Sequence, residues 1–104
     1  MGGNDLVGGT TAYSINKGYQ MPAMTPKPFD KYTVAQQKFI DQYTRKLCVV
    51  WCDFYLNFDR MPEDDGTGRA AVYVEYAKSK KWITQDGSAV LSAGWQTAAA
   101  FLKR

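Results

Sequence analysis

The chain has 104 residues, of which 45% are hydrophobic and 14% are aromatic, and its formal net charge is +3. This length allows one domain with a single modest core and excludes a multidomain fold. The sequence contains no histidine, which excludes histidine-dependent catalysis and histidine metal sites.

The charge is distributed unevenly along the chain. Residues 1–52 carry a net charge of +3, residues 53–65 carry −4, and residues 66–104 carry +4 from six basic and two acidic side chains. Two basic segments therefore flank one acidic segment. This distribution is compatible with contact to a polyanion, but it lacks the dense basic stripe of a dedicated nucleic-acid-binding protein.

Residues 1–32 are predicted to form an extended arm without regular secondary structure. Five glycines loosen this segment, and Pro22, Pro26 and Pro28 remove backbone donors and favour extended conformations. The arm nevertheless carries more apolar side chains than a disordered linker usually does. We expect it to bind partner subunits through five large side chains: Tyr13, Tyr19, Met21, Met24 and Phe29.

Residues 33–58 are predicted to form one long or lightly broken helix that supplies the core. Apolar and aromatic side chains recur in steps of three and four from Phe39 to Phe58, which places them on one helical face. Thr33 and Gln36 have the spacing of a capping box at its start. The same pattern fits a short coiled-coil seam, but it covers only two heptads and therefore favours a globular core.

Cys48 and Cys52 lie four residues apart in apolar surroundings within this helix. A structural zinc site would need two further Cys or His ligands, which the sequence does not contain. We interpret the two cysteines as buried reduced thiols, with a disulfide between two copies of the helix as the alternative. Reduced thiols, no signal-peptide pattern and no membrane-spanning apolar run favour a soluble intracellular protein, free or within a particle assembled in the cell.

An acidic loop over residues 59–68 is predicted to separate the long helix from a helix over residues 69–81. The spacing of its carboxylates does not match a calcium-binding loop. Asp65 or Thr67 is expected to cap the helix that follows. In that helix, Tyr73 shares one face with Ala70, Val74 and Ala77.

The C-terminal part is predicted to contain a small β-hairpin and a final helix. Residues 82–84 and 89–91 are short apolar runs on either side of Asp86-Gly87, which is a strong hairpin signal. Ser92 is expected to cap a helix over residues 93–104. Trp95, Ala98, Ala99 and Leu102 are expected to face inward in this helix.

Residues 70–104 resemble the end of a winged-helix domain, in which a helix, a hairpin and a further helix follow one another. The last helix opens with Leu91-Ser92-Ala93-Gly94, as in that family. The expected fold class is therefore mainly α with a small β-hairpin (α+β), a winged-helix-like domain over residues 33–104 preceded by the arm. This resemblance implies nucleic-acid contacts by Arg69, Tyr73, Tyr76, Lys78, Lys80, Lys81, Lys103 and Arg104. It departs from the family in having an acidic loop before the second helix and Asp86 in the wing.

No motif of a known catalytic site is present. The sequence lacks a nucleophile elbow and a phosphate-binding loop. Tyr76 and Lys80 are spaced as in short-chain dehydrogenases, but no dinucleotide-binding turn precedes them. We therefore expect a protein that is not an enzyme and has no cofactor, metal or small-molecule substrate.

Three functional hypotheses follow. The first is a small subunit or adaptor of a larger assembly, such as a virion of a phage or another multi-protein particle, which binds protein subunits or copies of itself. The alternatives are a winged-helix nucleic-acid-binding regulator and a small inhibitor that binds a host protein.

Overall fold

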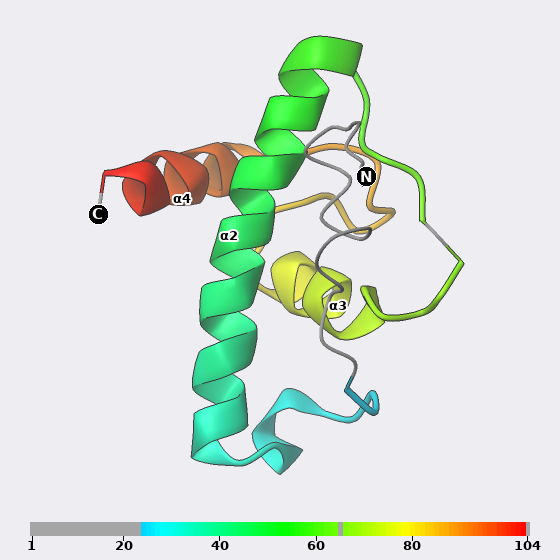
Figure 1. Cartoon of the computed structure of the whole chain (residues 1–104), viewed down its shortest axis with the longest axis vertical. Coiled ribbons are helices and arrows are strands. Elements are labelled where there is room, and N and C mark those ends of the chain that lie inside the picture. Colours follow the sequence, from blue (N-terminus) through cyan, green and yellow to red (C-terminus); the bar gives the residue numbers. More distant parts are fainter. Residues whose placement is uncertain (1–23, 65, 104) are drawn as a thin grey trace, which may run out of the picture.

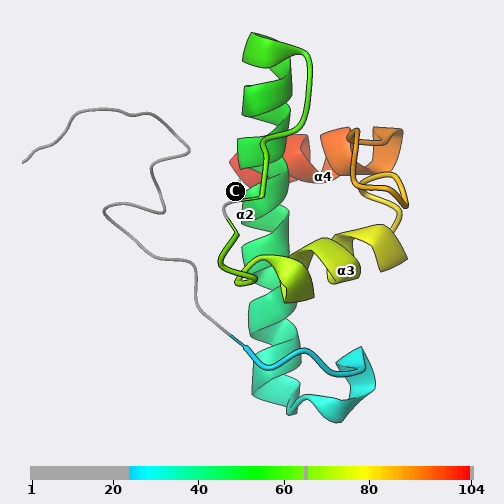
Figure 2. The same ribbon diagram turned by 90° about the vertical axis from the view of Figure 1, so that its right-hand side faces the viewer.

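A computed structural model gives the structure of the protein and describes residues 24–64 and 66–103. Within these residues the chain is mainly helical and contains no strand. The described elements are η2 (Phe29–Lys31), a single 3-10 turn, and the α-helices α2 (Val34–Phe58), α3 (Ala71–Ser79) and α4 (Ser92–Leu102). Both α3 and α4 lie across α2, and the segment 24–33 lies beside the N-terminal end of α2 (Figures 1 and 2).

The prediction of one long helix is confirmed, and its start has the predicted capping box. The backbone N–H of Gln36 donates to Thr33 Oγ1 over 3.1 Å, and the backbone N–H of Thr33 donates to Gln36 Oε1 over 3.0 Å. The helix ends at Phe58, and the next residue, Asp59, adopts the left-handed conformation with φ of 58°. At 25 residues, α2 spans about 37 Å and is long enough to pack against both other helices.

The core lies where α3 and α4 cross α2. Ile40, Cys48, Tyr73 and Ala77 are fully buried. The other buried core side chains are Tyr32, Tyr43, Leu47, Trp51, Cys52, Val72, Trp82, Ile83, Val90 and Ala98. The apolar stripe of α2 therefore serves an intramolecular core, as its pattern predicted.

The predicted β-hairpin is wrong. Residues 82–91 form a compact loop in which Ile83 and Val90 make one isolated antiparallel bridge. The tip of the loop is organised by side chains, because Asp86 Oδ1 accepts hydrogen bonds from the hydroxyl of Thr84 and from the backbone N–H of Ser88. These bonds lower the pKa of Asp86 to about 2.

Two predicted helix caps are also wrong. The N-cap of α3 is Ala70, which makes no side-chain capping bond, while Thr67 Oγ1 accepts from the backbone N–H of Arg69 in the preceding turn. Asp65 lies outside the described residues. Ser92 is the first residue of α4, and Leu91 occupies the cap position without a capping bond.

The end of α3 directs the chain back into the core. The backbone N–H groups of Lys81 and Trp82 donate to the carbonyls of Lys78 and Ala77 over 3.1 and 2.9 Å. This is a Schellman motif, and Lys81 occupies its left-handed position with φ of 62°. As a result, Trp82 enters the core and is only 5% exposed.

Candidate interaction surfaces

The described part of the predicted arm is bound to the chain's own helical domain. Met24 packs against the core, and the rings of Phe29 and Tyr76 have centroids 4.9 Å apart. Tyr32 is buried, and its hydroxyl donates to the carbonyl of Thr25 over 2.8 Å. Two of the five predicted partner-binding side chains therefore have intramolecular contacts. The other three, Tyr13, Tyr19 and Met21, lie outside the described residues.

A mostly apolar hollow of about 260 Å³ lies between this segment and α3. Its walls include Pro28, Phe29, Tyr32, Val72, Glu75 and Tyr76. Small-molecule sites usually have volumes of about 300–1,000 Å³. The hollow is therefore slightly smaller than a usual small-molecule site.

The predicted nucleic-acid contacts do not all lie on an accessible surface. Tyr73 is fully buried, so the prediction that its ring contacts nucleic acid is wrong. The hydroxyl of Tyr76 donates to Asp41, and the ammonium group of Lys78 lies 3.2 Å from the carboxylate of Glu75. Of the predicted contacts near the C-terminal end of α3, Lys80 and Lys81 are exposed.

The remaining predicted contacts lie elsewhere. Arg69 precedes the N-terminal end of α3, and Lys103 follows the end of α4, while Arg104 lies outside the described residues. The end of α4 lies well away from the end of α3 in both ribbon views (Figures 1 and 2). The predicted set therefore does not form one continuous face.

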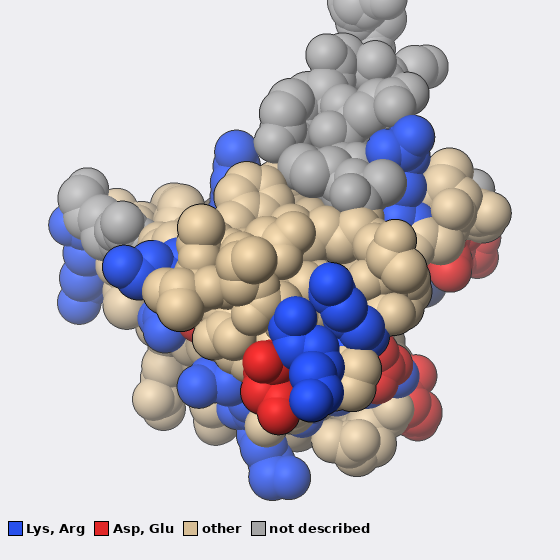
Figure 3. Space-filling model, turned by 90° about the horizontal axis from the view of Figure 1, so that it is seen from below, with Lys and Arg blue, Asp and Glu red and all other residues tan. Residues whose placement is uncertain are grey.

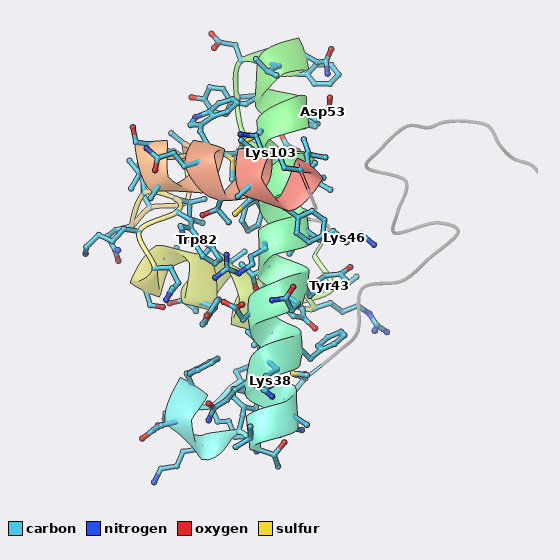
Figure 4. The ribbon with its side chains drawn as sticks, turned by 90° about the vertical axis from the view of Figure 1, so that its left-hand side faces the viewer. Lys38, Tyr43, Lys46, Asp53, Trp82 and Lys103 are labelled. Carbon is cyan, nitrogen blue, oxygen red and sulfur yellow. The ribbon has the colours of Figure 1, made fainter. Side chains whose placement is uncertain are left out.

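Basic side chains are mixed with acidic ones on the surfaces that the figures show. In the view along α2 from its N-terminal end, lysine and arginine side chains lie next to acidic side chains, beside a broad uncharged area (Figure 3). Lys38, Lys46 and Lys103 are spaced along the length of the molecule, with Asp53 farther along α2 (Figure 4). The described surface drawn in Figure 3 shows no continuous basic stripe.

A polar and aromatic cluster joins α2, α3 and the loop 82–91. We call Asp41, Arg45, Tyr76, Lys80 and Trp82 the junction cluster. Tyr76 Oη donates to Asp41 Oδ1 over 2.5 Å, and Arg45 Nε donates to Asp41 Oδ2 over 2.8 Å. The guanidinium carbon of Arg45 lies 5.2 Å from the centre of the Trp82 ring, and Lys80 Nζ lies 5.9 Å from that of Tyr76. Trp82 lies beside α2, between α3 and α4 (Figure 4).

The junction cluster shifts the pKa values of its members. Partial burial acts to raise the pKa of Asp41, but hydrogen bonds from Arg45 and Tyr76 and the charges of Arg45 and Lys80 lower it overall. Burial and the hydrogen bond to Asp41 raise the pKa of Tyr76. Asp41 is therefore a stable anion and Tyr76 a stable neutral phenol at neutral pH, which suits them to a structural link rather than to proton transfer.

The two cysteines are buried free thiols, as interpreted from the sequence. Burial raises the pKa of Cys48 to about 12 and that of Cys52 to about 11. Because the thiolate is the reactive form, neither side chain is suited to act as a nucleophile at neutral pH.

Large apolar side chains are exposed at the ends of the helices. The last buried residue of α2 is Phe54, and beyond it Leu56 is 77% exposed and Phe58 is 52% exposed. We call Leu56 and Phe58 the apolar tip. In α4, Leu102 is 69% exposed and Ala99 is also exposed, so the prediction that these two side chains face inward is wrong, whereas Ala98 is buried as predicted.

The described residues offer neither a metal-binding cluster nor a membrane-spanning helix. They contain no group of three or more His, Cys, Asp or Glu side chains that could hold a metal ion. No described helix combines the length and the apolar character that crossing a membrane requires.

The sequence reasoning missed Asp41, Arg45 and Trp82 as members of one site. Asp41 and Arg45 are four residues apart, which is the spacing of an ion pair on a helix surface, so this pair had a local signal.

Comparison of the chain with protein-family models, curated proteins and solved structures gave no match.

Proposed function

We propose that the chain is a non-enzymatic small subunit or adaptor of a larger assembly, and that it binds other protein chains through the apolar tip. The observation that carries this proposal is the exposure of Leu56 and Phe58 at one end of the long helix. In Figure 1 this end of α2 extends beyond α4 and continues into the acidic loop.

Exposed apolar side chains acquire favourable free energy when a partner removes them from water. Burial contributes roughly 25 cal/mol for each Å² of apolar surface, so one leucine and one phenylalanine together could contribute several kcal/mol. Exposed apolar patches with polar rims are characteristic of protein interaction sites. Here Asp59, Arg60 and Glu63 lie close along the chain and supply polar neighbours.

Sedimentation velocity of the full chain over a wide concentration range tests this proposal. We expect species larger than the monomer at high concentration, and we expect Leu56→Asp to shift the population back towards monomer. Because Leu56 is exposed, the substitution should leave the helical circular dichroism and the melting temperature close to those of the wild type.

Val34→Asp is the matched control, because Val34 is 69% exposed at the opposite end of α2. It makes the same chemical change and should leave the sedimentation profile unchanged. A wild-type chain that remains monomeric at every concentration, or assemblies that Leu56→Asp does not alter, would contradict a role of the tip in self-assembly.

The second candidate is a winged-helix-like nucleic-acid-binding regulator. It is favoured by the exposed Lys80 and Lys81 at the end of α3. Adding a short duplex to the same sedimentation experiment separates the two candidates. A nucleic-acid-binding protein would co-sediment with the duplex and lose this binding steeply as salt is added, because phosphate contacts release counterions.

A further inference from the structure

The hollow between residues 24–33 and α3 is suited to an apolar group. Its walls are mostly apolar, and the tyrosine hydroxyls of these walls have partners within the chain. The hydroxyl of Tyr32 donates to the carbonyl of Thr25, and the hydroxyl of Tyr76 donates to Asp41. The two rings therefore face the hollow without a polar group that a ligand must satisfy.

The charged side chains of the walls also have partners within the chain. Lys27 Nζ lies over the ring of Tyr32, 5.0 Å from its centre. The carboxylate of Glu75 lies 3.2 Å from Lys78 Nζ. A polar ligand would have to compete with these contacts, whereas an apolar group would displace only water.

The apolar tip supplies side chains of the right kind and size. An apolar cavity of about 150 Å³ can bind benzene. The hollow, at about 260 Å³, therefore has room for the ring of Phe58 or the side chain of Leu56. Both side chains are exposed in the chain to which they belong.

The tip and the hollow lie towards opposite ends of α2. The tip is at the C-terminal end of this helix, which spans about 37 Å. Residues 24–33, which form one wall of the hollow, lie beside its N-terminal end (Figures 1 and 2). Because the helix holds the two sites apart, the hollow can receive the tip of another copy but not its own.

The charges of the two regions favour contact between the tip and the hollow. Residues 53–64, which include the tip, carry four acidic side chains and one basic side chain, a net charge of −3. Residues 24–33 and 71–81, which include both walls of the hollow, carry five lysines and two acidic side chains, a net charge of +3. Contact between two tips would instead bring two negative regions together.

We propose that the hollow of one copy binds the apolar tip of a second copy, so that the chains associate head to tail. This inference rests on the proposed function, because it names the partner of the tip. The two contacting surfaces differ, so the contact is heterologous. Each pair of copies keeps one unused tip and one unused hollow, and repetition of the contact gives a ring or an open filament.

Two complementary variants of the full chain test this inference by sedimentation velocity. Leu56→Asp removes the tip and keeps the hollow. Ala71→Asp places a carboxylate in the hollow and keeps the tip, since Ala71 lines the hollow and is exposed. Ala71 is also the first residue of α3, where a negative charge is favourable, so this variant should fold.

Each variant alone should self-associate at least about tenfold more weakly than the wild type. An equimolar mixture should form a dimer and no larger species, because one functional tip and one functional hollow remain in each pair. Val34→Asp is the matched control for Ala71→Asp. Val34 is likewise exposed and the first residue of its helix, but it does not line this hollow, so its variant should assemble as the wild type does. Circular dichroism verifies that every variant keeps its helices.

Salt provides a second measurement on the mixed dimer. Added sodium chloride should weaken it severalfold, because opposite net charges are screened. A contact between regions of like charge would become stronger instead. A mixed dimer that salt strengthens would therefore overturn the inference.

The failure of this inference is distinguishable from the failure of the proposed function. If Ala71→Asp assembles as the wild type does while Leu56→Asp is monomeric, the tip binds another surface: the inference is overturned and the proposed function stands. A mixture of the two variants that stays monomeric also overturns the inference. Assemblies that Leu56→Asp does not weaken would overturn both. A wild-type chain that is monomeric at every concentration overturns the inference and leaves a different protein as the partner of the tip.

Discussion

At the scale of single residues, Gly94 is the described glycine whose surroundings leave the least room for a side chain. It lies in α4 against the loop that follows α3 and is buried. A Cβ atom at this position would lie 2.1 Å from the carbonyl oxygen of Trp82 and 2.6 Å from Cγ1 of Val90. The first neighbour is backbone and accepts the hydrogen bond from Leu91, so it cannot move without breaking the contact between loop and helix.

Gly94→Ala should therefore destabilise the protein, although alanine is the better helix former. Helix propensity favours alanine by about 1 kcal/mol, while overpacking of this kind costs about 1–3 kcal/mol and displaces backbone as well. Because backbone must move, we expect a cost at the upper end of this range and a net loss of about 2 kcal/mol, which lowers the melting temperature of a domain of this size by roughly 8–16 °C. Thermal unfolding followed by circular dichroism measures the change.

Gln96→Ala is the control for this prediction, because Gln96 is exposed in the same helix. It should leave the melting temperature equal or slightly higher. A Gly94→Ala variant that is as stable as the wild type would show that α4 can move away from the loop, contrary to the close packing described above.

At the scale of elements, Asp41 links α2 to α3 through Tyr76, and its lowered pKa makes this link sensitive to acid. The pKa of Asp41 in the folded state lies below its value in the unfolded state. The unfolded state therefore binds a proton first as the pH falls. The stabilisation that the Asp41 carboxylate gives the folded state is present above about pH 4, and it is lost as the pH falls through the folded-state pKa of Asp41.

Asp41→Asn should lower the free energy of unfolding by about 1 kcal/mol at neutral pH, and this difference should close in the acid range. Tyr76→Phe should cost a similar amount at neutral pH, because it removes the hydrogen bond and leaves the pair with Arg45. Urea unfolding at a series of pH values measures both. Parallel stability curves for wild type and Asp41→Asn below about pH 4 would contradict this account.

The elements that sequence could predict are those specified by local chemistry. α2 has a capping box and a long apolar period, so its start and its end were predicted within one residue. The Asp-Gly turn signal is equally local, but strands need pairing partners. Here α3 ends at Ser79 and α4 begins at Ser92. The apolar runs on the two sides of the turn, residues 82–84 and 89–91, are therefore too short to form more than one β-bridge.

The candidate sites depended more on tertiary structure. Tyr73 belongs to the apolar face of its helix and is buried against α2, where the centre of its ring lies 4.9 Å from that of Tyr43. This burial excludes the nucleic-acid contact that was predicted for Tyr73. The junction cluster combines side chains that are 35 or more positions apart, such as Asp41 with Tyr76. Only the pairs four residues apart, Asp41 with Arg45 and Tyr76 with Lys80, have a local signal in the sequence.

At the scale of the whole molecule, residues 24–32 of the predicted arm pack against the helical domain. Tyr32 is 6% exposed and belongs to the core cluster, and its carbonyl accepts a hydrogen bond from the side chain of Gln37. Phe29 covers Tyr76, which in turn binds Asp41. Residues 24–32 therefore support the same junction that joins α2 and α3.

Removing residues 1–32 should consequently destabilise the protein far more than removing residues 1–23. The longer deletion additionally removes Tyr32 and Phe29, and loss of a buried aromatic side chain costs about 3–5 kcal/mol. We expect the two truncated chains to differ by at least about 3 kcal/mol in free energy of unfolding in urea. The full-length variant Tyr32→Ala isolates the packing contribution and should reproduce most of this difference. Equal stability of the two truncated chains would mean that the segment 24–32 rests on the domain without supporting it, and the arm would then extend to the start of α2, as predicted from the sequence.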